Sequence, residues 1–113
     1  MQFASRIGFF ESRRIAPLKN AITRRSILVV HPPPRGIQDQ VANRFHAGST
    51  GITSLIASHP LMLVLCGHIH EQAGFTHRNG TLIVNCALNK NGCGAIIDCK
   101  EGAPIDVKMI KRK

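Results

Sequence analysis

The chain has 113 residues and a formal net charge of +9, and this length fits one domain with a modest hydrophobic core. It contains no run of about 18 apolar residues that could span a bilayer and no N-terminal apolar block of the secretory type. The sequence therefore predicts one soluble, cytoplasmic domain over residues 1–113 with no membrane partner.

The basic residues gather at the two ends of the sequence. Residues 1–25 hold six Lys or Arg and one acid, residues 26–99 hold four and three, and residues 100–113 hold five and two. We expect a basic N-terminal segment with a short helix, then a core, and finally a last strand with a basic tail. Such ends could bind nucleic acid through phosphates, but there is no Trp or Tyr for base stacking, so solvated charge is the favoured interpretation.

Two further compositional features bear on the location of the protein in the cell. The Arg-rich N-terminal segment shares its composition with organelle transit peptides, which is an alternative to a structural role. The cysteines form no Cys-x-x-Cys pair, so we expect reduced and mostly buried thiols rather than a disulfide framework. They are Cys66, Cys86, Cys93 and Cys99.

The first half of the chain predicts a helix, a strand, a second helix and a second strand. Residues 17–23 share an apolar helical face that begins at a proline, which is tolerated at a helix N-terminus. Residues 27–30 (ILVV) and 61–65 (LMLVL) are unbroken apolar runs, typical of parallel strands that are buried on both faces. A short helix capped by Ser49 or Thr50 separates them, so a parallel strand, helix, strand unit follows. Its first loop, residues 32–48, is long, and loops of this length tend to be functional or disordered.

The second half of the chain predicts hairpins. Asn79-Gly80 can supply the positive φ angles of a two-residue turn. It joins AGFTH (73–77) to TLIVN (81–85), and Asn91-Gly92 precedes a further strand in CGAIID (93–98). A last strand, residues 105–110, alternates apolar and polar residues. The expected fold class is therefore α/β, with a mixed sheet and short helices.

Histidines follow both predicted parallel strands. His31 ends the first strand, and His68 and His70 follow the second after a glycine. Ligands gather at the carboxyl ends of strands in open α/β sheets, and in an extended segment the side chains of His68 and His70 would point the same way. Three imidazoles can then converge, and imidazole suits zinc, iron, copper and nickel.

Each histidine also has a simpler interpretation. A single histidine at a strand end is usually a hydrogen-bonded surface residue, and a His-x-His pair arises by chance as well. His46 precedes a helix N-terminus, where backbone N–H groups favour an anion, so it could act near a phosphate or serve only loop packing. We interpret His59 and His77 as structural.

A family resemblance rests on several of these segments together. The segments SILVVHPPPRG, HAGSTGI, LVLCGHIHEQAG, GTLIVNCA and GCGAIID occur in this order over about residues 15–99. They resemble the C-terminal half of the calcineurin-like metallophosphoesterases, especially the small prokaryotic type. The resemblance implies a partial αββα sandwich, and it gives the helix near residues 17–23 a structural role.

The resemblance also implies a binuclear metal centre that hydrolyses phosphomonoesters or phosphodiesters. His31 and His68 would ligate one divalent ion (Mn, Fe or Zn) and His70 the other, and His46 would lie near the phosphate. Asn85 matches an asparagine of the family, although Cys86 and Ala87 depart from its pattern. Two ions would clamp the phosphate and activate a water for in-line attack.

The family's acidic motifs are missing from this sequence. An Asp-x-His pair, a Gly-Asp-x-x-Asp segment and a Gly-Asn-His-Asp/Glu segment have no counterpart among its acids, which are Glu11, Asp39, Glu71, Asp98, Glu101 and Asp106. Neutral histidines cannot offset the repulsion between two dications. We therefore expect an inactive half, completed by a separately encoded N-terminal half or by self-association. A mononuclear zinc hydrolase and a non-catalytic module for protein or nucleic-acid interaction are the alternatives.

Overall fold

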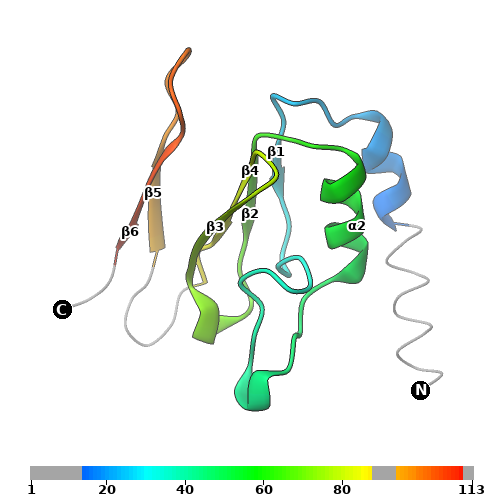
Figure 1. The fold of residues 1–113 in the computed structure, drawn as a ribbon, viewed down its shortest axis with the longest axis vertical. Coiled ribbons are helices and arrows are strands. Elements are labelled where there is room, and N and C mark those ends of the chain that lie inside the picture. The colour runs from blue at the N-terminus through cyan, green and yellow to red at the C-terminus, as the bar shows by residue number, and fades with distance from the viewer. Residues whose placement is uncertain (1–13, 88–93, 111–113) are drawn as a thin grey trace.

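The computed structural model describes residues 14–87 and 94–110, and Figure 1 shows three layers of secondary structure. A four-stranded sheet lies in the middle, α2 and the short 3-10 helix η1 cover one face, and a two-stranded sheet covers the other. The predicted α/β class with a mixed sheet and few helices is confirmed. Within the described ranges, no helix combines the length and apolar content needed to cross a bilayer.

The four-stranded sheet has the order β1-β2-β4-β3. The parallel strands β1 (Ile27–Val29), β2 (Leu63–Cys66) and β4 (Thr81–Asn85) run side by side, and β3 (Gly74–Arg78) pairs with β4 in the antiparallel sense. Asn79 and Gly80 join β3 to β4 with φ angles of 53° and 84°, the positive values expected of a two-residue hairpin turn. The predicted parallel unit and the predicted hairpin are both present.

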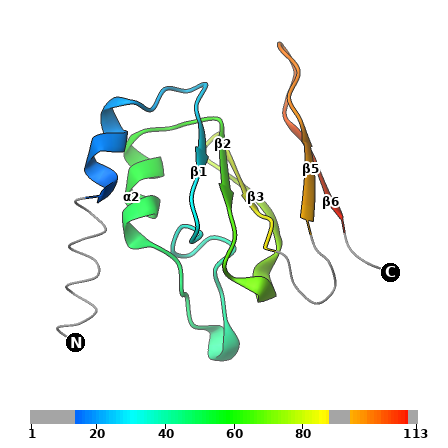
Figure 2. The same ribbon diagram turned by 180° about the vertical axis from the view of Figure 1, so that it is seen from behind.

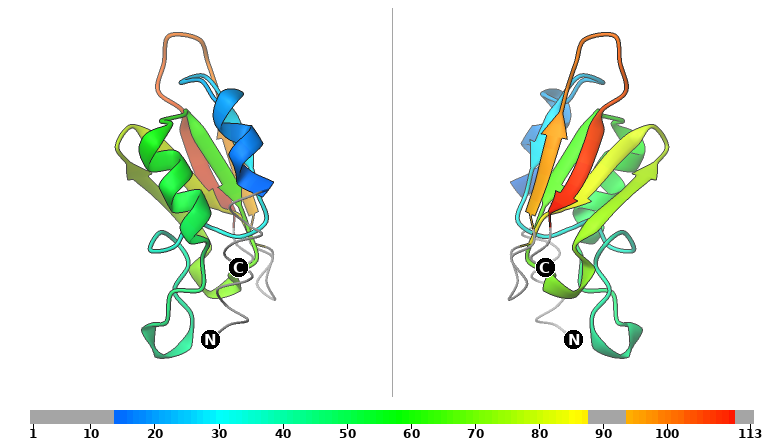
Figure 3. Two further views of the ribbon diagram at one scale, coloured as in Figure 1. Left: turned by 90° about the vertical axis from the view of Figure 1, so that its right-hand side faces the viewer. Right: turned by 90° about the vertical axis from the view of Figure 1, so that its left-hand side faces the viewer.

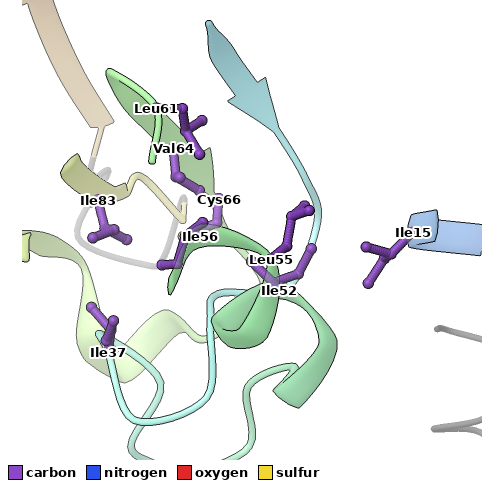
Figure 4. Close-up of a cluster of buried hydrophobic side chains, with 9 residues drawn as sticks. All are labelled: Ile15, Ile37, Ile52, Leu55, Ile56, Leu61, Val64, Cys66 and Ile83. Carbon is purple, nitrogen blue, oxygen red and sulfur yellow. The ribbon is translucent and has the colours of Figure 1, made fainter. Parts of the chain in front are cut away.

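The helical side holds the larger apolar cluster. The helix α2 (Thr50–Ser58) begins where the Ser49 side chain accepts a hydrogen bond from the Ile52 N–H, as a helix N-cap does. Its buried side chains pack with residues of β2 and β4 and with Ile15, which precedes η1 (Ala16–Asn20) (Figure 4). The short helix expected from residue 17 is therefore present as a 3-10 helix, with its proline in the first turn.

The opposite face of the sheet is covered by a separate hairpin (Figure 2). This hairpin consists of β5 (Gly94–Asp98) and β6 (Asp106–Ile110), which pair in the antiparallel sense. Its inward side chains pack over Leu63, Leu82 and Val84. The alternation predicted for the last strand is confirmed, because exposed and half-buried residues alternate along β6.

Two expectations about burial are wrong in part. The run at β1 was expected to be buried on both faces, yet Val29 is 73% exposed, because β1 is an edge strand and the second sheet does not cover it. β2 and β4 do show the expected burial. Cys66 is buried, Cys86 is half-buried and Cys99 is exposed, all as free thiols, while Cys93 and the Asn91-Gly92 turn lie outside the described residues.

Gly48 stands at a close backbone crossing in the loop between β1 and α2. The Ser49 N–H donates to the Pro33 carbonyl at 2.8 Å, and the Arg35 N–H donates to the Ser49 carbonyl at 2.9 Å. A Cβ atom at Gly48 would lie 2.7 Å from the carbonyl oxygens of Pro33 and Pro34. The crossing therefore requires glycine at this position.

We expect Gly48→Ala to lower the free energy of unfolding by roughly 1–3 kcal/mol, because backbone atoms must move to admit the methyl group. Urea unfolding followed by circular dichroism measures this change. Gly94→Ala is the matched control, since a Cβ there meets nothing within 4 Å. Equal stabilities of the two variants would contradict the close crossing.

Candidate functional site

The rings of His31 and His68 meet at the carboxyl ends of β1 and β2. Their Nε2 and Nδ1 atoms lie 2.9 Å apart, and the ring centroids are separated by 4.7 Å. The backbone explains this placement, because the ladder between the strands continues beyond them: Val30 N–H donates to the Leu65 carbonyl and Gly67 N–H to the His31 carbonyl, both at 2.9 Å. The two exposed histidines are therefore held together by the sheet.

His70 does not join this pair, which corrects the expected convergence of three rings. The prediction assumed an extended segment, but His68 has a φ of 70°, in the left-handed region that favours glycine, and His70 begins the 3-10 helix η3 (His70–Gln72). Within residues 14–87 and 94–110, no three His, Cys, Asp or Glu side chains are grouped so that they could hold a metal ion. The structure thus brings together two of the three predicted ligands.

The separation of the two nitrogens is close to that of two ligands of one metal ion. Metal–nitrogen distances of about 2.0–2.1 Å at a tetrahedral angle place two ligand nitrogens about 3.3 Å apart. The observed 2.9 Å is short of this by a few tenths of an ångström, which exposed rings can accommodate by rotation. Without a metal, the same contact is a hydrogen bond in which one ring donates to the other.

His46 forms a second polar centre with a residue that sequence reasoning missed. Its Nδ1 lies 2.7 Å from Oδ1 of Asp39, whose Oδ2 accepts hydrogen bonds from the N–H groups of Gly36 and Gly48, both at 2.9 Å. Asp39 is 1% exposed, whereas the His46 side chain is 44% exposed. The only signal in the sequence was an acid inside the long loop, and nothing there indicated that it is buried.

Opposing effects set the pKa of Asp39. Burial raises the pKa of this carboxyl, but the hydrogen bonds from Gly36, His46 and Gly48 and the charge of His46 lower it, and the net pKa is below its ordinary value. The carboxylate is therefore ionised at neutral pH and can only accept hydrogen bonds, so His46 Nδ1 carries the hydrogen and donates it to Asp39. This contact fixes the tautomer of His46, so Nε2 is the nitrogen left to exchange protons with a ligand.

Asn85 ties the long loop to the turn that carries His68 and His70. Its fully buried amide donates to the carbonyls of Gln38 at 3.0 Å and Ile69 at 2.9 Å, and its oxygen accepts from the Ala87 N–H. The Gln38 side chain in turn donates to the Gln72 carbonyl at 2.8 Å. In this structure Asn85 therefore positions backbone segments around the histidines.

The two residues interpreted as structural lie in other parts of the fold. His59 caps the C-terminal end of α2, and its Nδ1 lies 2.9 Å from the Ser58 hydroxyl. His77 lies on β3 with its ring edge-on to that of Phe75. Both placements agree with a structural role.

Comparison with known proteins informs the fold alone. No family model matches the chain, and no curated protein matches it. A crystal structure aligns with 92% of this chain at 19% sequence identity and a TM-score of 0.66. The chain spans only 40% of the length of that protein, so the shared fold is part of a longer chain there.

The lowered pKa of Asp39 predicts how stability depends on pH. A carboxyl whose pKa is lower in the folded state stabilises the fold above its unfolded pKa of about 3.9, and this contribution disappears as the pH falls through the folded pKa. Asp39→Asn should therefore cost roughly 1–3 kcal/mol at pH 7, where the paired carboxylate is lost. The difference from the wild type should shrink below about pH 4.

Urea unfolding of both proteins across this pH range measures the difference. Glu101→Gln, at an exposed position, is the control and should match the wild type throughout. A penalty for Asp39→Asn that is the same at every pH would mean that the carboxylate charge is not what stabilises the loop.

Proposed function

We propose that this chain is the C-terminal half of a metallophosphoesterase-type αββα sandwich and supplies histidine ligands for the hydrolysis of phosphate esters. The observation that carries the proposal is the contact between His31 and His68 at 2.9 Å. According to the family resemblance, these two histidines would ligate the same metal ion. The mixed sheet between a helical layer and a second sheet supports it at the level of fold.

Each residue of the site has a proposed task. His31 Nε2 and His68 Nδ1 would bind one divalent ion (Mn, Fe or Zn), while His70, at the start of η3, would serve a second. A bound ion supplies Lewis-acid stabilisation of the phosphoryl oxygens and lowers the pKa of a bound water. His46, oriented by Asp39, would exchange a proton with the phosphate through Nε2.

The chain needs further negative charge to hold two ions. His31 and His68 are neutral ligands when they bind a metal, and Asp39, the buried acid, already accepts hydrogen bonds from Gly36, Gly48 and His46. Two dications at close range require carboxylates and a bridging anion. We propose that a second polypeptide contributes these groups, as a separately encoded N-terminal half would, and that the chain by itself does not turn over substrate.

Metal binding is the direct test of the site. We expect one equivalent of Zn²⁺ or Mn²⁺ to bind in isothermal titration calorimetry at pH 7.5. His68→Ala should weaken this binding by about tenfold or more, because one of two nitrogen ligands is lost. His59→Ala is the matched control, since His59 contacts Ser58 at the end of α2.

Equal binding by the wild type and His68→Ala would remove the metal site from the proposal.

An activity assay tests separately whether the site in this chain is incomplete. The metal-loaded chain should show no turnover of an aryl phosphodiester above that of free metal. Turnover that is abolished in His68→Ala would show that a single chain builds a complete site and would contradict the need for a partner.

A further inference from the structure

β1 is an apolar strand at one edge of the four-stranded sheet. Within the described residues it pairs with β2 and with no other strand. Ile27 is 48% exposed and Val29 is 73% exposed, although both are apolar side chains. The parallel register places them beside Leu63 and Leu65, on the face that the second sheet covers, so this covering layer stops short of β1.

The two-stranded sheet has its own unpaired edge on the side of the molecule where β1 lies, within the described residues. In the part of the chain that the structure describes, β5 pairs with β6 alone. Figure 3 shows β5, rather than β6, on the side where η1 and β1 lie. We call this surface the open flank. It comprises the edge of β1 that no described strand pairs with, the side chains of Ile27 and Val29, and the exposed Arg24 and Arg25 just before β1.

The chemistry of this edge differs from that of a protected edge strand. Edge strands are usually protected by a short length, a lysine, a proline or a bulge. β1 is short, with three residues, but it has no lysine, proline or bulge. An added strand would bond to the free backbone groups of β1 and place alternate side chains against Ile27 and Val29. The surface is therefore suited to strand addition.

The charge of the open flank favours an acidic partner over a second copy of the chain. Arg24 and Arg25 are both exposed, and neither forms an ion pair with an acidic residue in the described part of the chain. A second copy would bring the same cations to the interface, and like charges across an interface oppose binding. An acidic segment would instead be attracted and steered to this side.

We propose that the open flank binds an extended, acidic segment of another polypeptide, which adds a strand to β1 and covers Ile27 and Val29. The inference concerns this surface alone and requires no metal at the histidines.

A labelled peptide in which valine and glutamate alternate is the probe, with the same peptide carrying lysine in place of glutamate as its control. Fluorescence anisotropy in the presence of EDTA should show saturable binding of the acidic peptide only. Val29→Asp should weaken this binding by about tenfold, since the burial of one valine is lost and an acid faces the peptide. Ile96→Asp is the control, because Ile96 is exposed on the outer face of β5.

A second pair of variants tests the charge. Arg25→Glu should weaken binding of the acidic peptide, whereas Lys100→Glu, exposed beyond β5, should not. Circular dichroism confirms that each variant is folded. Failure of the acidic peptide to bind, or equal loss in Val29→Asp and Ile96→Asp, would overturn the proposal. So would light scattering that finds a stable dimer of the chain alone which Val29→Asp dissociates, since a second copy would then occupy the flank.

Discussion

The parallel pairing of β1 with β2 is the constraint on which the candidate site depends. Hydrogen bonds from Val30 to Leu65 and from Gly67 to His31 extend the ladder beyond the strands, so that their carboxyl ends stay in register. His31 and His68, which are 37 positions apart in the sequence, are brought within hydrogen-bond distance by this register. A shift of the pairing would separate the two rings and remove the site.

The two proposals, a metal centre at the histidines and a partner at the open flank, both call for acidic groups. In the proposed two-metal centre, carboxylates would have to stand beside the neutral ligands His31 and His68. The open flank exposes apolar side chains next to uncompensated cations. The metal-centre proposal concerns electrostatics, and the open-flank proposal concerns the packing of a sheet edge. A partner that supplies an acidic strand would cover the open flank whether or not the histidines bind a metal.

The loop from Pro32 to Gly48 shows how a segment without regular structure becomes part of a site. Asp39 accepts hydrogen bonds from both ends of the loop, and Asn85 binds the loop to the turn after β2. The orientation of His46 follows from these contacts. Sequence reasoning placed His46 near the site by resemblance and assigned Asp39 no role, because burial of an acid in a loop leaves no periodic pattern.

The sequence by itself determined the parallel unit, the hairpin turn at Asn79-Gly80 and the placement of His31 and His68 at strand ends, because apolar runs, glycines and prolines act locally. Only the tertiary structure decided that β1 is an exposed edge and that the segment after His68 turns into η3 instead of staying extended. These outcomes depend on which strands find neighbours and on the left-handed backbone of His68. Both are set by contacts between distant segments, which no local pattern encodes.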